Sequence, residues 1–496
     1  MEEVAVACAA AVFVLSGCAL FLQACWHGTL LWAPRRVRKP EPEDATDRPR
    51  VLVQLPLFNE PAVVDRLLDA VMGLDWPAER LVVQILNDST DDTPERVERW
   101  LAQHRPAFQV DHICRADRAG FKAGALQAGL DRAPDVPWVM VYDADFVPGM
   151  GDLAYAFRWV QADTAAVQLR WDHLNAEANG LTRAQALNLD AHFAVEQQGR
   201  EVLGVWNAFN GTAGLWRTEA IRAAGGWQAD TLAEDLDLSV RVQLAGWRVR
   251  YVDGWGVPAE LPADFGAYRA QQRRWTQGGA ACARKHLRST GRLKPRRLRW
   301  HARAMLCASS IHLPIWAMAA ASVGLTWGAV RGVPGADRAL DAGVVMGLLL
   351  VSFATVYKTA ANRRHPWRPR DAPARPGLRD WARGWRWFLP RMFALWLIGA
   401  GMAWWHVRAW WAGWRGVPAE FVRTPKRGSD PGPPLPRGAA PRGPFPWAEW
   451  LHAAVFVAAA ALGASAGRWG LVPFHLLLAG GYAWVATGVR ASRSAA

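Results

Sequence analysis

The sequence predicts an α/β domain built on a parallel, doubly wound sheet and inserted between transmembrane α-helices. Two observations carry this prediction. Between Val51 and Tyr251, short runs rich in β-branched residues alternate with helical stretches, which is typical of parallel sheets. The 496-residue chain is 51% hydrophobic and holds 30 tryptophans, yet its mean hydropathy is close to zero. A polar domain joined to an apolar one explains that combination better than one uniform globule.

Five strands and two helices are the clearest elements expected in the α/β part. The strands are Val51–Leu55, Leu81–Leu86, Trp138–Tyr142, Ala165–Leu169 and Arg248–Val252. The helices are Ala62–Met72 and Pro94–Gln103. The domain is placed at residues 50–285, which is long enough to bury a hydrophobic core.

Apolar stretches on both sides of this domain predict a multi-pass membrane protein. Residues 1–34 hold one apolar stretch long enough to cross a bilayer, which takes about 20 residues. Two glutamates precede it and basic residues follow it, so we expect the N-terminus outside and the following domain in the cytoplasm. A basic segment at the membrane surface is expected over residues 286–301, followed by a transmembrane hairpin at 302–360. A second hairpin is expected at 447–490.

Residues 361–446, between the two hairpins, are expected to be cytoplasmic or interfacial. Their apolar part, residues 388–411, contains proline and charged residues and is too short for two crossings. We therefore interpret it as an interfacial or re-entrant helix.

The net charge of +14 gathers beside the apolar segments, which favours a lipid bilayer as partner and argues against nucleic acid. The plasma (inner) membrane is the expected location.

Two aspartates at the end of the third predicted strand are the strongest candidates for chemistry. Asp143 and Asp145 follow an apolar run, and residues two apart on a strand project to the same side. Two carboxylates at the carboxyl end of such a strand suit Mg²⁺ or Mn²⁺ that also carries substrate phosphates. A solvated acidic turn is the alternative interpretation of so short a motif.

Three further polar sites each allow two interpretations. Asp88 follows the second strand, where it is either a nucleotide contact or part of a turn. Lys122 stands beside two glycines and either meets a phosphate or lies on a basic surface loop. Glu234 and Asp235 open a helix, where acidic residues are common for dipole reasons, and Asp235 is a candidate general base.

The segment Ala267–Gly279 predicts a helix with one chemically distinctive face. Gln271, Arg274 and Trp275 are spaced i, i+3 and i+4, so their side chains share that face. An amide, a guanidinium and an indole together suit an anion and a sugar ring. A basic amphipathic helix on the membrane surface is the alternative.

The six cysteines stand singly and predict neither a disulfide framework nor a metal site.

Taken in order, these motifs resemble those of the processive family 2 glycosyltransferases, specifically the cellulose synthase-like A and C mannan and glucan synthases. The resemblance covers about residues 50–290 and includes Val167–Trp171, Leu181–Gln197 and Phe209–Arg217. It implies a GT-A-like (Rossmann-like) fold. It also implies a hexosyltransferase that elongates a β-linked polysaccharide from UDP-glucose or GDP-mannose and passes the polymer across the membrane. A non-processive enzyme that adds one sugar to a lipid or lipid phosphate is the alternative, and an idle membrane scaffold is a more distant one.

The resemblance also implies roles for individual residues. Asp143 and Asp145 would hold Mg²⁺ or Mn²⁺, and Asp235, with Glu234 beside it, would be the general base. The implied nucleotide-sugar contacts are Pro56, Glu60, Asp88, Lys122, Asp143 and Arg274. The implied contacts to the acceptor polysaccharide are Trp275, Gln271, Gly211 and Thr212. Residues 420–428 resemble a gating loop at Phe421, Thr424 and Lys426, whereas Asn87 and Ala233 depart from the family pattern.

Overall fold

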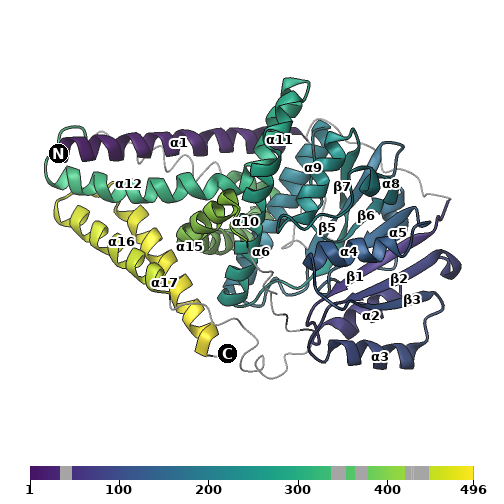
Figure 1. Ribbon diagram of the computed structural model, residues 1–496. Coiled ribbons are helices and arrows are strands. Elements are labelled where there is room, and N and C mark those ends of the chain that lie inside the picture. The colour runs from purple at the N-terminus through teal and green to yellow at the C-terminus, as the bar shows by residue number, and fades with distance from the viewer. Residues whose placement is uncertain are drawn as a thin grey trace.

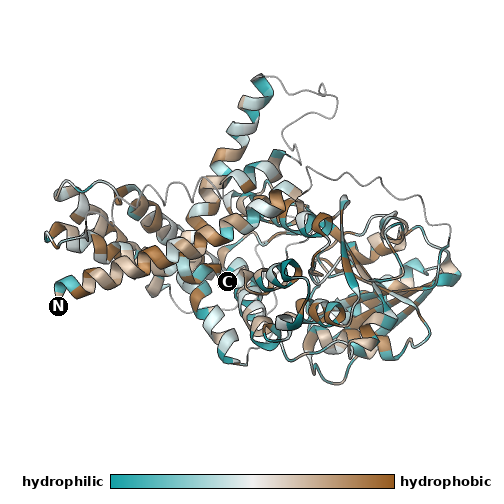
Figure 2. Ribbon diagram, turned by 90° about the horizontal axis from the view of Figure 1, so that it is seen from above, coloured by the Kyte–Doolittle hydropathy of each residue, from teal (hydrophilic) through white to brown (hydrophobic). Residues whose placement is uncertain are grey.

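The computed structural model describes residues 1–33, 47–336, 354–362, 378–418, 426, 428 and 446–494. Long helices form a bundle at one end of the molecule, and an α/β domain lies at the other (Figure 1). Hydrophobic residues run along most of the bundle helices, whereas hydrophilic residues are frequent on the outer helices and loops of the domain (Figure 2). The two-part organisation predicted from composition is therefore present.

A seven-stranded sheet in the order β3-β2-β1-β4-β6-β5-β7 organises the α/β domain. Its strands are β1 Val51–Leu57, β2 Leu81–Asn87, β3 Gln109–Cys114, β4 Trp138–Val141, β5 Thr164–His173, β6 Gly214–Arg217 and β7 Arg248–Ala259. All five predicted strands are confirmed. The prediction of a purely parallel sheet is wrong, because β6 runs antiparallel to both β4 and β5.

Two strands of the sheet were not predicted, and each lacks the usual signal. β3 lies at the edge of the sheet and is mostly polar, so it has no apolar run. β6 is only four residues long and follows a segment rich in glycine and polar residues. Its direction is set by the strands on its two sides, not by its own sequence.

Alternate side chains of the strands build two hydrophobic cores, one on each face of the sheet. Val53 and Leu55 of β1 face one core, and Leu52 faces the other. The first core is covered by α2 (Val64–Met72), α3 (Thr93–His104) and α5 (Asp152–Phe157). The second is covered by α4 (Phe121–Asp131), α8 (Thr218–Ala223) and α9 (Glu234–Leu244). This arrangement leaves the carboxyl ends of the strands free to form a site.

The helices that join the domain to the bundle follow β5 and β7. They are α6 (Gly180–Ala191), η3 (His192–Gln197), α7 (Gln198–Leu203), α10 (Phe265–His286) and α11 (Arg296–Leu306). Asp264 is the N-cap residue of α10, and its carboxylate accepts a hydrogen bond from the Ala267 backbone N–H. α10 packs against α9 on one side and against α15 (Leu378–Arg415) on the other, and it therefore connects the sheet to the bundle.

In the part of the chain that the structure describes, the bundle contains α1 (Glu2–Trp32), α12 (His312–Val330), α15, α16 (Trp447–Ser465) and α17 (Val472–Ser494). Within the described residues, four segments are long and apolar enough to cross a membrane: Glu2–Trp32, Ala308–Val330, Trp447–Ser465 and Val472–Ser492. They correspond to the predicted N-terminal helix, the first helix of one hairpin and both helices of the other. Most of the remaining predicted crossing lies outside the described residues. Which membrane the helices span, and in which direction, stays a prediction.

The stretch predicted as an interfacial or re-entrant helix is the middle of α15, a single 38-residue helix that contains Pro390. α15 packs against α10, α12, α17 and α6, so it contacts both the bundle and the domain. Its depth relative to a bilayer stays a prediction.

Candidate active site

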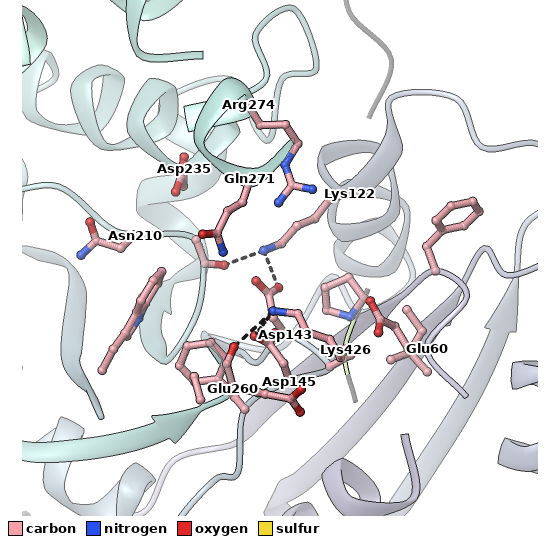
Figure 3. Close-up of a pocket in the computed structure, with 18 of the residues that line it drawn as sticks. Glu60, Lys122, Asp143, Asp145, Asn210, Asp235, Glu260, Gln271, Arg274 and Lys426 are labelled. Carbon is pink, nitrogen blue, oxygen red and sulfur yellow. Dashed lines mark hydrogen bonds and ion pairs between the residues drawn. The ribbon is translucent and has the colours of Figure 1, made fainter. Parts of the chain in front are cut away.

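A pocket opens at the carboxyl ends of β1, β2 and β4 and is roofed by α10 (Figure 3). Most of the residues predicted for the site line it, although they come from eight different segments of the chain. These residues are Pro56, Glu60, Asp88, Lys122, Asp143, Asp145, Gly211, Glu234, Asp235, Gln271, Arg274, Trp275 and Lys426. The fold therefore brings together groups that lie up to several hundred residues apart in the sequence.

The two aspartates after β4 each contact a lysine. Lys122 Nζ lies 2.5 Å from Asp143 Oδ1 and 2.8 Å from the Gly211 carbonyl oxygen, and Lys426 Nζ lies 2.6 Å from Asp145 Oδ2. Burial raises the pKa of Asp143, and the Lys122 ammonium partly offsets that effect. The pKa of Lys122 is raised overall. Burial lowers it, but the negative charges of Asp143 and Glu234 outweigh that effect.

The donor set at this point fits a hard divalent cation. No cluster of three or more His, Cys, Asp or Glu side chains suited to a metal occurs among the described residues. Asp143 and Asp145 offer two carboxylates on one pocket wall, and Mg²⁺ is typically held by one or two carboxylates together with substrate phosphates. These two aspartates are therefore the residues that would hold Mg²⁺ or Mn²⁺.

Asp235 stands in the first turn of α9, beside Glu234. Burial, reinforced by the Glu234 charge, raises the pKa of Asp235 to about 7. Gly211 makes room for it: the φ of Gly211 is +88°, and a Cβ added there would meet Asp235 Oδ2 at 3.0 Å. The Gly211 carbonyl oxygen thus accepts a hydrogen bond from Lys122, and the absence of a side chain at Gly211 leaves space for Asp235.

The predicted face of α10 points into the pocket. In Figure 3 Gln271 and Arg274 lie above Asp143, and Gln271 lies beside the end of the Lys122 side chain. Burial lowers the pKa of the Arg274 guanidinium, although the carboxylates of Glu234, Asp143 and Asp145 oppose that effect. Trp275 is 39% exposed, and its ring centroid lies 6.5 Å from that of Trp171, so an indole surface is open to a ligand.

Thr212 and Asn87 lie behind the pocket wall. Thr212 is buried, and its hydroxyl accepts a hydrogen bond of 2.8 Å from the Asp143 backbone N–H. It therefore contacts the backbone of the first aspartate. Asn87 is buried too, and its side-chain amide contacts His112 at 3.1 Å. Of the predicted gating-loop residues, Phe421 and Thr424 lie outside the described residues, and Lys426 contacts Asp145 as stated above.

Several residues that line the pocket or support its wall were missed by sequence reasoning. Arg115 donates a hydrogen bond of 2.8 Å from Nε to the Asp88 carboxylate and so neutralises it. The Arg118 guanidinium lies 3.2 Å from the centre of the Phe58 ring, which makes a flat surface at the same end of the pocket. Arg115 and Arg118 belong to the same basic loop as Lys122, and only Lys122 was predicted there as a phosphate contact. Asn210, Trp171 and Glu260 also line the pocket.

A buried cluster around Asp237 holds α9 against α10. The Asp237 carboxylate lies 2.7 Å from His286 Nε2, Lys285 Nζ and Arg241 Nε. Burial alone would raise the pKa of Asp237, but the bonds from His286 and Lys285 and the Arg241 charge outweigh it and hold the pKa at about 2. Asp237 thereby ties the helix that carries Asp235 to the helix that carries Trp275.

The substitution Asp237→Asn is expected to lower the free energy of unfolding by roughly 3–5 kcal/mol, because it leaves buried cations without their counter-charge. The carboxylate's pKa is depressed on folding, so its contribution is present above about pH 4 and is lost as the pH falls toward 2. Thermal unfolding of the detergent-solubilised protein between pH 3 and 7 tests this. Asp230→Asn removes a partly exposed partner of Lys285 and is the matched control, with little change expected.

Comparison with known proteins assigns a class to this site. Residues 49–278 match the protein family described as glycosyltransferase like family 2. The structure of a mannosyltransferase from Pyrobaculum calidifontis, in complex with GDP-Man and Mn²⁺, aligns with a TM-score of 0.51 and 22% identity. That alignment covers 72% of this chain and 98% of the other, and it supports the GT-A-like fold. Residues 49–278 thus resemble a family 2 glycosyltransferase domain, in agreement with the resemblance drawn from the motifs.

Curated plant relatives are similar over about half of this chain. The chain is 42% identical over 246 residues to glucomannan 4-beta-mannosyltransferase 2 from Arabidopsis thaliana, covering 48% of this chain and 46% of the relative. It is 41% identical over 257 residues to glucomannan 4-beta-mannosyltransferase 1 from Oryza sativa subsp. japonica, covering 50% and 49%. The chain therefore matches about half the length of these relatives.

Proposed function

We propose that the protein is an inverting β-mannosyltransferase that extends a β-linked, mannan-type polysaccharide from a nucleotide sugar, with GDP-mannose as the favoured donor. One observation carries the proposal: Asp143, Asp145, Asp235 and Trp275 converge on one pocket of a domain that resembles family 2 glycosyltransferases. The donor is favoured on similarity, since the named plant relatives are mannosyltransferases and the similarly folded Pyrobaculum calidifontis structure holds GDP-Man.

The charges of the pocket support a division of labour along its length. Arg118 and Phe58 offer a cation and a ring to the nucleobase, next to the neutralised Asp88. Lys122 and Arg274 place positive charge where the diphosphate leaves. Bound Mg²⁺ or Mn²⁺, held by Asp143 and Asp145, would supply further charge for the leaving group.

Asp235 is the proposed general base. A carboxylate with a pKa near 7 is well matched to removing a proton from a hydroxyl at neutral pH. It would deprotonate the acceptor hydroxyl as that oxygen attacks the anomeric carbon from the face opposite the leaving nucleoside diphosphate. One displacement of this kind inverts the anomeric configuration. Trp275, beside Trp171, would stack on the acceptor sugar.

The position of the site relative to the bundle supports coupling of synthesis to export. α10 carries the acceptor-side residues and packs directly against α15 of the bundle. A growing chain that leaves the acceptor side would thus meet the bundle helices, and we propose that they pass it across the membrane.

The test is transfer by the purified protein in lipid vesicles, with GDP-mannose or UDP-glucose labelled in the sugar and Mg²⁺ or Mn²⁺ supplied. We expect a long labelled product from GDP-mannose that β-mannanase degrades. A product made only from UDP-glucose would contradict the proposed donor. A lipid carrying a single sugar would favour the non-processive alternative, and no transfer from either donor would overturn the proposal.

A further inference from the structure

A chain of hydrogen bonds joins the N-terminal membrane helix to the pocket. His27 of α1 points Nε2 at Glu196 Oε1, 3.0 Å away. His192 Nδ1 lies 3.0 Å from the other oxygen of the same carboxylate, and His192 Nε2 lies 3.3 Å from Asn210 Oδ1. Asn210 lines the pocket. Four side chains thus connect a segment that can span a membrane with the wall of the candidate active site.

The backbone around His192 and Glu196 is unusual in a way that accompanies function. Residues His192–Gln197 form η3, a π-helix inserted between α6 and α7. Such wide turns are rare and occur frequently at functional sites. Phe193, which follows His192 in η3, places its ring centroid 5.5 Å from that of Trp171 at the pocket wall. η3 therefore supports the pocket wall with an aromatic contact as well as with the hydrogen-bond chain.

The Glu196 carboxylate lies between His27 and His192 and determines the direction of the hydrogen bonds to both. Burial alone would raise the pKa of Glu196, but the hydrogen bonds from His192 and His27 outweigh it and hold the pKa well below its usual range. Glu196 is then ionised and can only accept, so both histidines donate to it. His192 Nδ1–H is thereby committed to Glu196, and Nε2 donates to Asn210 Oδ1 when that ring nitrogen also carries a proton.

Asn210 is held at two points and keeps one polar atom without a partner. Its backbone N–H donates to Gln168 Oε1 at 2.7 Å, and its side-chain oxygen faces His192. The side-chain nitrogen Nδ2 has no hydrogen-bond partner among the described residues. Asn210 directly precedes Gly211, which contacts the region of Asp235, and in Figure 3 it lies on the side of the pocket away from Glu60.

We propose, on the basis of the function proposed above, that Asn210 is a contact residue for the acceptor sugar. Its side-chain amide hydrogen-bonds a pyranose hydroxyl close to the attacking oxygen. His192, Glu196 and His27 are positioning residues that fix the orientation of this amide. The seating of α1 against the domain therefore sets the affinity for the acceptor.

Three substitutions test the proposal in the full-length protein in lipid vesicles, with manno-oligosaccharide as the added acceptor. Asn210→Asp preserves the shape of the side chain but removes the amide donor, and Glu196→Gln breaks the chain in its middle. Each is expected to raise the acceptor KM roughly tenfold, the loss of about one hydrogen bond, while the donor KM stays within about twofold. His27→Leu is expected to act in the same direction.

His301→Leu is the matched control. His301 accepts a hydrogen bond of 3.1 Å from Trp26 Nε1, next to His27 on the same helix, but it has no part in the chain to Asn210. This variant is expected to leave the acceptor KM within about twofold. Binding of manno-oligosaccharide to each protein, followed by tryptophan fluorescence, is measured without turnover and is expected to show the same pattern.

The outcomes separate this inference from the proposed function. Wild-type protein that transfers sugar, with the same acceptor KM and affinity in Asn210→Asp, would overturn the contact role. Equal weakening by His27→Leu and His301→Leu would show that α1 packing, and not the hydrogen-bond chain, is responsible. Wild-type protein that neither transfers mannose nor binds the oligosaccharide would overturn the proposed function itself.

Discussion

Replacing Asp235 with asparagine is expected to lower kcat by about 10²–10⁴-fold, because the reaction loses its general base. Asparagine keeps the size of the side chain, so the donor KM should change little. The measurement is transfer from labelled GDP-mannose at saturating donor and acceptor. In the unsubstituted protein, kcat/KM should fall as the pH drops below about 7, because the raised pKa of Asp235 leaves the carboxyl increasingly protonated there.

Glu219→Gln is a suitable control for that substitution. Glu219 lies in the first turn of α8, as Asp235 lies in the first turn of α9, but its side chain is exposed. If acidic residues at these positions serve only the helix dipole, the two variants will behave alike. Full transfer activity in Asp235→Asn would remove Asp235 from the mechanism.

Replacing Asp143 with asparagine is expected to reduce transfer by roughly 10²-fold or more, since a metal ion contributes several kcal/mol of charge stabilisation. The change also leaves Lys122 without its 2.5 Å partner in a buried position. Activity measured against Mn²⁺ concentration should shift to much higher concentrations or vanish. Titration calorimetry with GDP should lose its dependence on Mn²⁺.

The control for Asp143 is Asp92→Asn, an exposed acid at the same edge of the sheet that pairs with Arg96. Its activity and Mn²⁺ dependence should match those of the unsubstituted protein. A variant at Asp143 that keeps metal-stimulated GDP binding would show that the cation is held elsewhere. It would also leave the Lys122–Asp143 pair with a purely structural role.

The sequence alone determined the elements whose signal is local. The runs at β1, β2 and β4 are apolar and β-branched, so they predict buried strands before any partner is known. The position of Asp143 and Asp145 at the end of such a strand follows directly. The spacing of Gln271, Arg274 and Trp275 likewise needs only the period of a helix.

The tertiary structure alone decided which of those groups meet and what holds them. The direction of β6 depends on its neighbours, and the contact of Lys426 with Asp145 spans 281 positions of sequence. The hydrogen bonds from His27 to Asn210 join a membrane helix, a π-helix and a loop, and no local pattern encodes such a path. Local periodicity reports only how one segment folds, whereas burial, pKa shifts and hydrogen-bond partners arise from segments that are distant in the chain.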